Sequence, residues 1–209
     1  MKTAFPRLCL LLAVVMAAGV FAHADIVFTL GNNPQPDEHN ILFNTGTDLG
    51  SPVLGSIVNV PGAFVQFTSA SSLSGTGGNG QAVLTATTGL LTSFNFELLN
   101  GVGTFTDFIF NPTIPPGGPS NGSDLTVTVN ANDGSFNFTY SLGTGNNFLT
   151  IVATNGETIN SIDFSDPSGF ASLTQPRISG VSLPTSTPEP ASLLLLGSGL
   201  GFLAWRRRK

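Results

Sequence analysis

Few residues in this sequence could perform acid–base or nucleophilic chemistry. Between Asp25 and Pro188 there is a single histidine, His39, and there is no cysteine and no lysine. A hydrolase with a Ser-His-acid triad would have to use His39 as its base. That histidine lies in the polar stretch NNPQPDEHN, which predicts a solvated loop. The sequence therefore predicts a protein that is not an enzyme.

Two pairs of acidic residues could hydrolyse a glycosidic bond if they flanked a sugar: Asp37 with Glu38, and Asp163 with Asp166. Turn formation explains Asp37 and the dipeptide Asp166-Pro167 more simply. Loop carboxylates are also hard oxygen ligands that suit calcium. The candidate ligands of a structural calcium ion are therefore Asp37, Glu38, Asp163 and Asp166. Their spacing matches neither an EF-hand nor a calcium-binding nonapeptide repeat. No other cofactor is predicted.

The charge of the chain excludes one class of partner. Between Asp25 and Pro188 there are eleven acidic side chains against one basic side chain, Arg177, a formal charge of −10. Such a surface repels phosphate backbones, so no nucleic-acid partner is expected.

Carbohydrate binding is judged from the aromatic residues. Sugar rings usually stack on exposed tryptophan or tyrosine, and this chain has one of each, Trp205 and Tyr140. Trp205 lies in an apolar C-terminal run, and Tyr140 falls on the apolar face of a predicted hairpin. Phenylalanine could substitute, although it lacks a polar atom.

The elements that must position these residues are predicted to be strands, because apolar residues alternate and no helical period of any length occurs. The strongest element is the hairpin LTVTVNANDGSFNFTYSL, with Asp133-Gly134 as a type I′ turn. This turn pairs Ala131 with Phe136 and Val129 with Phe138. All apolar side chains then share one face, an agreement that a one-residue slip would destroy.

Further strands are predicted at 63–68, 82–88, 90–98, 105–110, 148–154, 158–164 and 178–183. Residues 69–81 and 111–124 are predicted to be loops, and Asn155-Gly156 is predicted to be a second hairpin turn. About eight short strands predict an all-β fold, an antiparallel two-sheet sandwich that is jelly-roll-like, over residues 25–183. The phenylalanines are expected to form its core.

The N-terminus has the pattern of a secretory signal peptide. Lys2 and Arg7 precede the apolar run 8–20, and the small residues Ala22 and Ala24 predict cleavage by signal peptidase before Asp25. An uncleaved membrane anchor is the alternative. Cleavage would remove Cys9, the only cysteine, so the exported protein would fold without disulfides.

The C-terminus predicts a membrane anchor. Residues 191–205 are apolar, and as a helix they would span about 22 Å, which is short against a hydrocarbon core of about 30 Å. The basic residues that follow can snorkel, and they should stay cytoplasmic by the positive-inside rule; they are Arg206, Arg207, Arg208 and Lys209. A single transmembrane helix at 191–205 would then hold residues 25–183 outside the inner membrane.

A linker, residues 184–190, precedes this helix and contains Pro188-Glu189-Pro190. The tripeptide, the apolar helix and the basic end together resemble the PEP-CTERM sorting signal, a tail also called the ice-binding protein C-terminal domain. The resemblance implies processing near the tripeptide by exosortase, a membrane-embedded protease or transpeptidase. It also implies sorting to the cell surface or the extracellular space, where extracellular polysaccharide would be a partner.

The body adds a weaker resemblance. The stretches NNFLTIVATNGETINSIDF and RISGV resemble the last strands of exported bacterial sandwiches that carry this tail, which implies a fold and no ligand. Two functions therefore stay open. One is a non-enzymatic surface or matrix protein, and the other is a carbohydrate- or calcium-dependent binding module on the same export route.

Overall fold

The computed structural model describes residues 25–46, 48–77, 82–116 and 123–184. The predicted signal peptide, the PEP tripeptide, the predicted membrane helix and the basic tail all lie outside the described residues. Within the described part, none of the helical segments has the length and apolar character needed to cross a bilayer.

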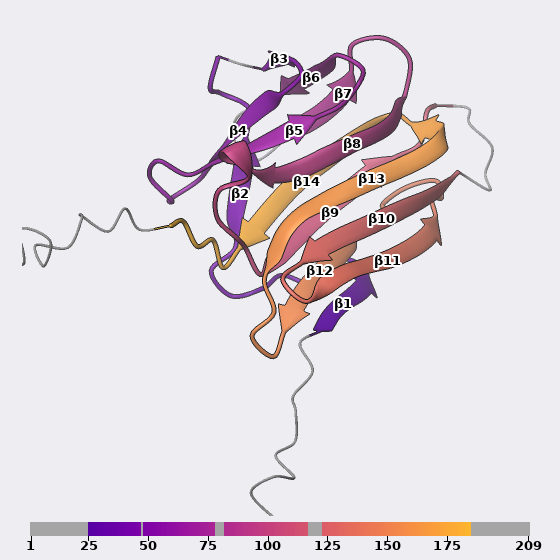
Figure 1. The fold of residues 1–209 in the computed structure, drawn as a ribbon. Coiled ribbons are helices and arrows are strands. Elements are labelled where there is room, and N and C mark those ends of the chain that lie inside the picture. The colour runs from indigo at the N-terminus through magenta and orange to yellow at the C-terminus, as the bar shows by residue number, and fades with distance from the viewer. Residues whose placement is uncertain (1–24, 47, 78–81, 117–122, 185–209) are drawn as a thin grey trace, which may run out of the picture.

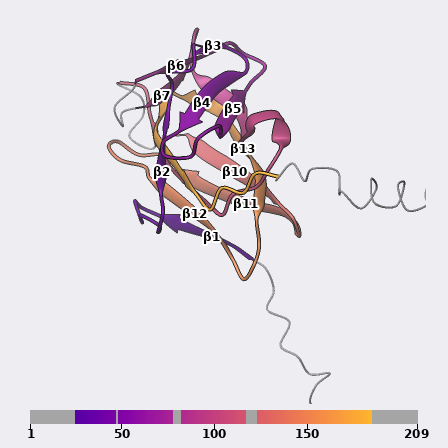
Figure 2. The same ribbon diagram turned by 90° about the vertical axis from the view of Figure 1, so that its left-hand side faces the viewer.

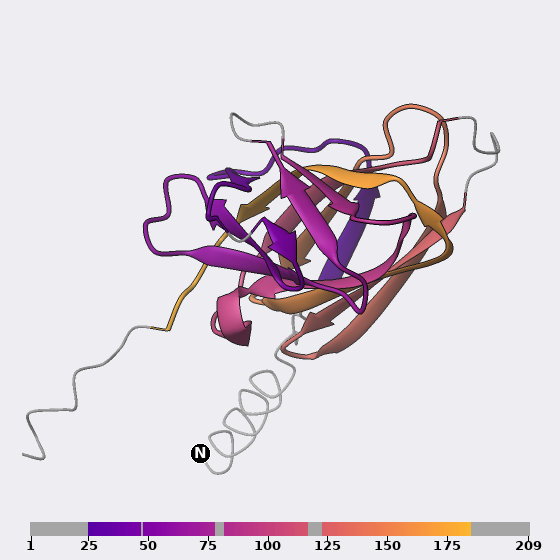
Figure 3. The same cartoon turned by 90° about the horizontal axis from the view of Figure 1, so that it is seen from above.

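The described chain is built from antiparallel strands in two layers (Figure 1 and Figure 3). The layer at the back in Figure 1, called sheet A, contains in spatial order β1 (Asp25–Leu30), β12 (Leu149–Thr154), β9 (Asp107–Thr113) and β14 (Ser172–Ser179). Beyond the first half of β14 this sheet continues through β7 (Val83–Ala86), β6 (Leu73–Thr76) and β3 (Leu49–Gly50). The predicted all-β antiparallel class is confirmed, while the jelly-roll-like order stays a prediction.

The front layer, called sheet B, contains six strands in the spatial order β11 (Gly134–Ser141), β10 (Asp124–Ala131), β13 (Ile159–Phe170), β8 (Leu91–Leu98), β5 (Phe64–Thr68) and β4 (Val53–Ile57). A single 3-10 turn, η1 (Leu99–Gly101), follows β8.

The two sheets are joined along one side by β2 (His39–Leu42). Its first residues, His39 and Asn40, pair with β14 in sheet A, and its last residues, Ile41 and Leu42, pair with β4 in sheet B. Figure 2 views this side of the molecule. On the opposite side the sheets end separately, at β1 and at β11. The sandwich is therefore closed along one side and open along the other.

The predicted hairpin exists as β10 and β11, and its faces are as predicted. Leu125, Val127 and Val129 are buried, while the intervening Thr126 and Thr128 are partly exposed. The predicted register is wrong by two residues, because Val129 pairs with Phe136 and Ala131 with Gly134. A shift of two preserves every face, since side chains alternate with a period of two.

The turn of this hairpin is also different from the prediction. Its two central residues are Asn132 and Asp133, and of the three residues 132–134 only Gly134 has a positive φ, at 144°. A type I′ turn needs positive φ at both central residues, so that assignment is wrong. The buried carboxylate of Glu157 stabilises the turn instead: its Oε1 accepts hydrogen bonds from the amides of Asn132 (2.9 Å) and Asp133 (3.4 Å).

The second predicted hairpin does not exist. β12 pairs with β1 and β9 in sheet A, whereas β13 pairs with β10 and β8 in sheet B. Asn155-Gly156 therefore turns the chain from one layer to the other. Both residues have positive φ, as the turn signal required, but a local turn signal does not specify which strands pair.

Other boundaries also differ from the prediction. Within the predicted loop 69–81, Leu73–Thr76 forms β6, and within the predicted loop 111–124 the strand β9 continues to Thr113. The last strand covers 172–179 rather than 178–183. The strands between residues 25 and 57, including β1 and β2, were not predicted, and His39 begins β2 rather than lying in a loop.

Phenylalanines from both layers interlock in the core, as predicted. Phe96 of β8 stacks on Phe108 of β9 with ring centroids 4.1 Å apart, and Phe164 of β13 meets Phe110 of β9 edge to face at 5.0 Å. All four side chains are at most 2% exposed. Each buried ring contributes about 2–3 kcal/mol, so this core can hold the sheets together without disulfides.

Candidate functional site

The structure separates the acidic residues predicted to act in pairs. Asp163 and Asp166 lie on opposite faces of β13, since Asp163 is exposed on the outside and Asp166 is fully buried. Asp166 Oδ1 accepts hydrogen bonds from the amides of Ser168 (2.9 Å) and Gly169 (3.0 Å), which fits the predicted turn role. Two carboxylates on opposite faces cannot flank one glycosidic bond.

Asp163 belongs to a polar network on the outer face of sheet B. Its two carboxylate oxygens accept hydrogen bonds from the side-chain amides of Asn95 and Asn130, both at 2.8 Å. A shallow hollow of about 400 Å³ lies over this region and includes Ser93 and Ser165 in its wall.

Asp37 and Glu38 lie in the connection from β1 to β2. Asp37 has φ 56°, the left-handed turn conformation that aspartate tolerates. Glu38 forms an ion pair with Arg177, with 2.5 Å between Oε1 and Nη1, and it also accepts a hydrogen bond from the amide of Gln35. Among the described residues, no three His, Cys, Asp or Glu side chains are grouped so that they could hold a metal ion. The calcium site stays a prediction.

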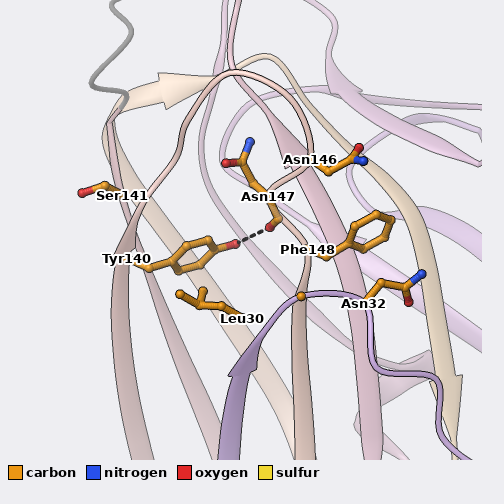
Figure 4. A pocket seen from close by; sticks show the side chains of 8 residues that line it. Leu30, Asn32, Tyr140, Ser141, Asn146, Asn147 and Phe148 are labelled. Atoms are coloured by element: carbon orange, nitrogen blue, oxygen red, sulfur yellow. Dashed lines mark hydrogen bonds between the residues drawn. The ribbon is translucent and has the colours of Figure 1, made fainter.

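A cleft of about 430 Å³ lies at the open side of the sandwich (Figure 4). It lies where β1 ends, where β11 ends and where the β11–β12 loop returns to sheet A. Its lining is formed by Leu30, Gly31, Asn32, Tyr140, Ser141, Asn146, Asn147 and Phe148. This volume is within the range of small-molecule sites.

Asn147 organises the loop that forms one wall of the cleft. Its side-chain amide donates to the carbonyls of Gly143 (2.9 Å) and Pro112 (3.1 Å), and its Oδ1 accepts from the amide of Gly143 (2.7 Å). Its own backbone amide donates to Asn111 Oδ1 at 2.7 Å. One side chain therefore closes the loop and ties it to β9.

Arg177 holds two residues of the cleft, Asn32 and Phe148, in position. Its Nη2 donates to Asn32 Oδ1 at 2.5 Å, and its guanidinium lies over the ring of Phe148, 5.9 Å from the centroid. Glu38 neutralises its charge. Arg177, the only basic residue in the body, therefore acts as a positioning residue for two residues of the cleft.

Tyr140 provides the floor of the cleft. The side chain is 9% exposed, and its hydroxyl donates to the carbonyl of Asn147 at 3.3 Å. Burial raises the pKa of Tyr140 well above its usual value near 10, so the phenol is neutral.

The lining combines the apolar surfaces of Leu30, Tyr140 and Phe148 with neutral amides and a hydroxyl, and it contains no charged side chain. Such a surface suits an uncharged, polyhydroxylated ligand better than an ion. It offers no pair of nucleophile and base. His39 pairs with Ile178 through β2 and, within the described chain, makes no hydrogen bond to a carboxylate or hydroxyl group.

Sequence comparison gives information about the C-terminus. Residues 186–209 match the family model described as the PEP-CTERM protein-sorting motif. The chain carries a PEP-CTERM sorting motif. Proteins with this motif are exported and sorted to the cell surface, and the motif implies processing by exosortase. The match covers a small part of the chain and indicates no catalytic family.

The body has weaker likenesses. No curated protein matches the chain. Among solved structures, a mutant of a carbohydrate binding module family 29 is 11% identical over 79% of this chain and 99% of that chain, with a TM-score of 0.29. Another family 29 module is 14% identical over 81% of this chain and 98% of that chain, with a TM-score of 0.21. Likenesses at these scores carry no argument about a ligand.

The cleft was not predicted from the sequence. The predicted position of Tyr140 on the apolar face is confirmed, but no site was predicted there. The local sequence of the loop, GTGNNF, looks like any turn. The cleft depends on contacts between distant residues, such as the 2.7 Å hydrogen bond from the amide of Gly31 to the carbonyl of Phe148.

Proposed function

We propose that this chain is a non-enzymatic protein of the cell surface or extracellular matrix, exported by a cleaved signal peptide and sorted through its PEP-CTERM tail. The observation that carries the proposal is the motif match at residues 186–209. In this proposal the domain organisation is a signal peptide at 1–24, a β-sandwich at 25–183, a linker at 184–190, a membrane helix at 191–205 and a basic cytoplasmic tail at 206–209.

Two features of the body support this proposal. Strand β1, described from Asp25 to Leu30, lies after the proposed signal-peptidase site, so cleavage there would not cut it. One of the two acidic pairs considered for hydrolysis, Asp163 and Asp166, lies on opposite faces of one strand. The net negative charge of the body and its phenylalanine core are also compatible with a stable displayed domain.

The test follows the chain through processing. Expression in a host with a matching exosortase should release a form that lacks residues 191–209, as measured by intact-mass spectrometry. Deleting Pro188-Glu189-Pro190 should leave the protein in the inner membrane, whereas Thr185→Ala, in the linker but outside the matched segment, should leave processing unchanged. Release of a form that still ends at Lys209 would contradict the proposal.

A second candidate function is saccharide binding by the same displayed domain, and the cleft of Figure 4 favours it. The ring of Phe148 and the buried ring of Tyr140 provide apolar surface, and Asn32 and Asn146 provide donors and acceptors beside it. Carbohydrate recognition uses this combination of stacking surface and neutral hydrogen-bonding groups.

Binding to a glycan array tests this candidate. A neutral oligosaccharide bound by the wild type should be bound at least about tenfold more weakly by Phe148→Ala, because stacking on the ring is lost. Leu49→Ala is the matched control, since Leu49 is 70% exposed on β3 and does not line the cleft. Equal binding by the wild type and Phe148→Ala would show that the oligosaccharide does not bind in this cleft. A rise in melting temperature with added calcium would support the calcium-dependent form of this module.

A further inference from the structure

Among the described strands, the open side of the sandwich leaves β11 as a long edge with a partner on one side only. Of the two longer edge strands in the described chain, β1 ends sheet A and β11 ends sheet B, and the third edge, β3, has only two residues. β11 extends for eight residues, Gly134–Ser141, and within the described part of the chain it pairs with β10 alone. In Figure 1 it is the outermost strand of the front layer, with β1 behind it.

The backbone groups on this free edge can be assigned. The amide of Leu142 donates to the carbonyl of Ser123 (3.0 Å), so these opposite residues form a hydrogen-bonded pair. Hydrogen-bonded and non-hydrogen-bonded pairs alternate along an antiparallel ladder. The backbone amides and carbonyls of Phe136, Phe138 and Tyr140 therefore form hydrogen bonds with β10. The amides and carbonyls of the alternate residues point away from it, and these are Ser135, Asn137, Thr139 and Ser141.

The side chains of β11 do not protect this edge. Natural edge strands are usually blocked by charged residues, proline or a bulge. GSFNFTYS contains no charge and no proline, although the body has eleven acidic residues, and its pairing with β10 has no register shift. Polar and aromatic residues alternate in it, which gives the high β-propensity and low charge of segments that pair with other chains.

The inner side of the edge also carries partly exposed apolar surface. Phe136 and Phe138 pack only partly against the core, and Phe138 stacks on Phe28 of β1 with ring centroids 5.0 Å apart. A strand added next to β11 would cover both rings as well as satisfy the backbone groups.

We propose that β11 is a self-association edge, through which two copies of this chain pair antiparallel. The strand is self-complementary in a register centred on Phe138. Ser135 then faces Ser141 of the second copy, and Asn137 faces Thr139 of the second copy. About eight hydrogen bonds form between the copies, and the two Phe138 side chains meet in a non-hydrogen-bonded pair, where side chains are closest. Sheet B becomes continuous across the dimer.

Proline at position 139 tests the proposal. The amide of Thr139 points outward, so Thr139→Pro removes an intermolecular donor and leaves the β10–β11 bonds in place, as prolines on natural edge strands do. Thr139→Ala is the matched control. It loses the same 2.9 Å side-chain hydrogen bond to Thr126 but keeps the backbone donor.

The measurement is analytical ultracentrifugation of the full chain, exported through its own signals and purified in detergent, over a series of concentrations. The C-terminal tail is identical in every variant, so differences between variants report on β11. The wild type and Thr139→Ala should form dimers with similar dissociation constants. Thr139→Pro should raise that constant at least about tenfold, since two donors are lost from a two-fold interface, while its thermal midpoint changes little.

Hydrogen exchange of the wild type supplies a test that needs no variant. The amides of Asn137 and Thr139 should become protected as the protein concentration rises, at concentrations where the dimer forms. Unprotected amides at all concentrations, a monomeric wild type, a Thr139→Pro variant that still forms dimers, or association into open-ended chains would each overturn the proposal.

Discussion

Tyr140 makes the burial of the cleft floor measurable, because it is the only tyrosine in the chain. Its ring is 9% exposed and lies beside Phe138, with centroids 5.8 Å apart. Its hydroxyl donates to a backbone carbonyl, which would repel a phenolate. We therefore expect the folded protein to keep the phenolic proton when the pH passes the usual tyrosine pKa near 10.

The sign and size of the effect on stability follow from linkage. Above pH 10 the unfolded chain releases the phenolic proton, whereas the folded chain retains it. The titration of Tyr140 therefore leaves the free energy of unfolding unchanged well below pH 10 and lowers it as the pH rises above 10. The loss is about 1.4 kcal/mol per pH unit until the folded-state pKa is reached. No lysine between Asp25 and Pro188 titrates in the same range.

Two assays check this. Near-ultraviolet absorbance of tyrosinate should show no titration step near pH 10 in the folded protein and a normal step in urea. The free energy of unfolding in urea should fall by about 1 kcal/mol between pH 10 and pH 11, since the unfolded tyrosine is already half ionised at pH 10. Tyr140→Phe should lose this part of the pH dependence and about 1 kcal/mol of stability for the missing hydrogen bond. A titration midpoint near 10 with a native circular dichroism spectrum would refute the burial of Tyr140.

Three further predictions concern stability, each measured by urea unfolding at neutral pH. Phe96→Ala should cost about 3–5 kcal/mol, because the ring is fully buried between the layers; a cost below about 1 kcal/mol would contradict that packing. Glu157→Ala should lower the free energy of unfolding by about 2–3 kcal/mol, because the backbone amides that donate to its Oε1 lose their acceptor. An unchanged free energy of unfolding would show that another group stabilises the turn. Gly180→Ala should cost well over 2 kcal/mol, because φ is 61° and a Cβ would lie 2.0 Å from Thr106 Oγ1. Gly46→Ala, at φ 80° with open space around it, is the control and should cost only about 1 kcal/mol.

The faces of strands were predictable where the pattern was clean. In β10 the alternation of valine and threonine identified the buried side correctly. In the predicted strand 90–98, the alternation predicted that Leu90, Phe94, Phe96 and Leu98 point inward; the last three are buried, whereas Leu90, just before β8, is 37% exposed. Alternation was uninformative in β9, where Asp107, Asn111 and Pro112 are buried together with the phenylalanines. A central strand covered on both sides loses the period of two on which the prediction depended.

Pairing was less predictable than burial. Asn155-Gly156 has the local chemistry of a hairpin turn, yet it connects the two layers. β1 was not predicted as a strand, and its partner β12 begins more than 100 residues later in the chain. Short polar strands such as β2 gain their stability from neighbours on two sheets, so their own composition gives little signal.

The candidate sites show the same division. The sorting motif at Pro188–Pro190 was recognised from contiguous residues, and the family model matches the same segment. The paired roles considered for Asp163 and Asp166 were inferred from closeness in sequence, and β13 places the two on opposite faces. The cleft was not predicted at all, because its walls come from β1, β11 and a loop that Asn147 ties to β9.

By itself, the sequence determined the class of the fold, the buried face of the clearest strands and the sorting tail, since each is encoded by neighbouring residues through a local period or a contiguous motif. The tertiary structure alone decided the register of β10 against β11, the layer that each strand joins, the cleft at Tyr140 and the free edge of β11. A shift of two residues leaves every local pattern intact, so only the packing of segments distant in the chain can select among those arrangements.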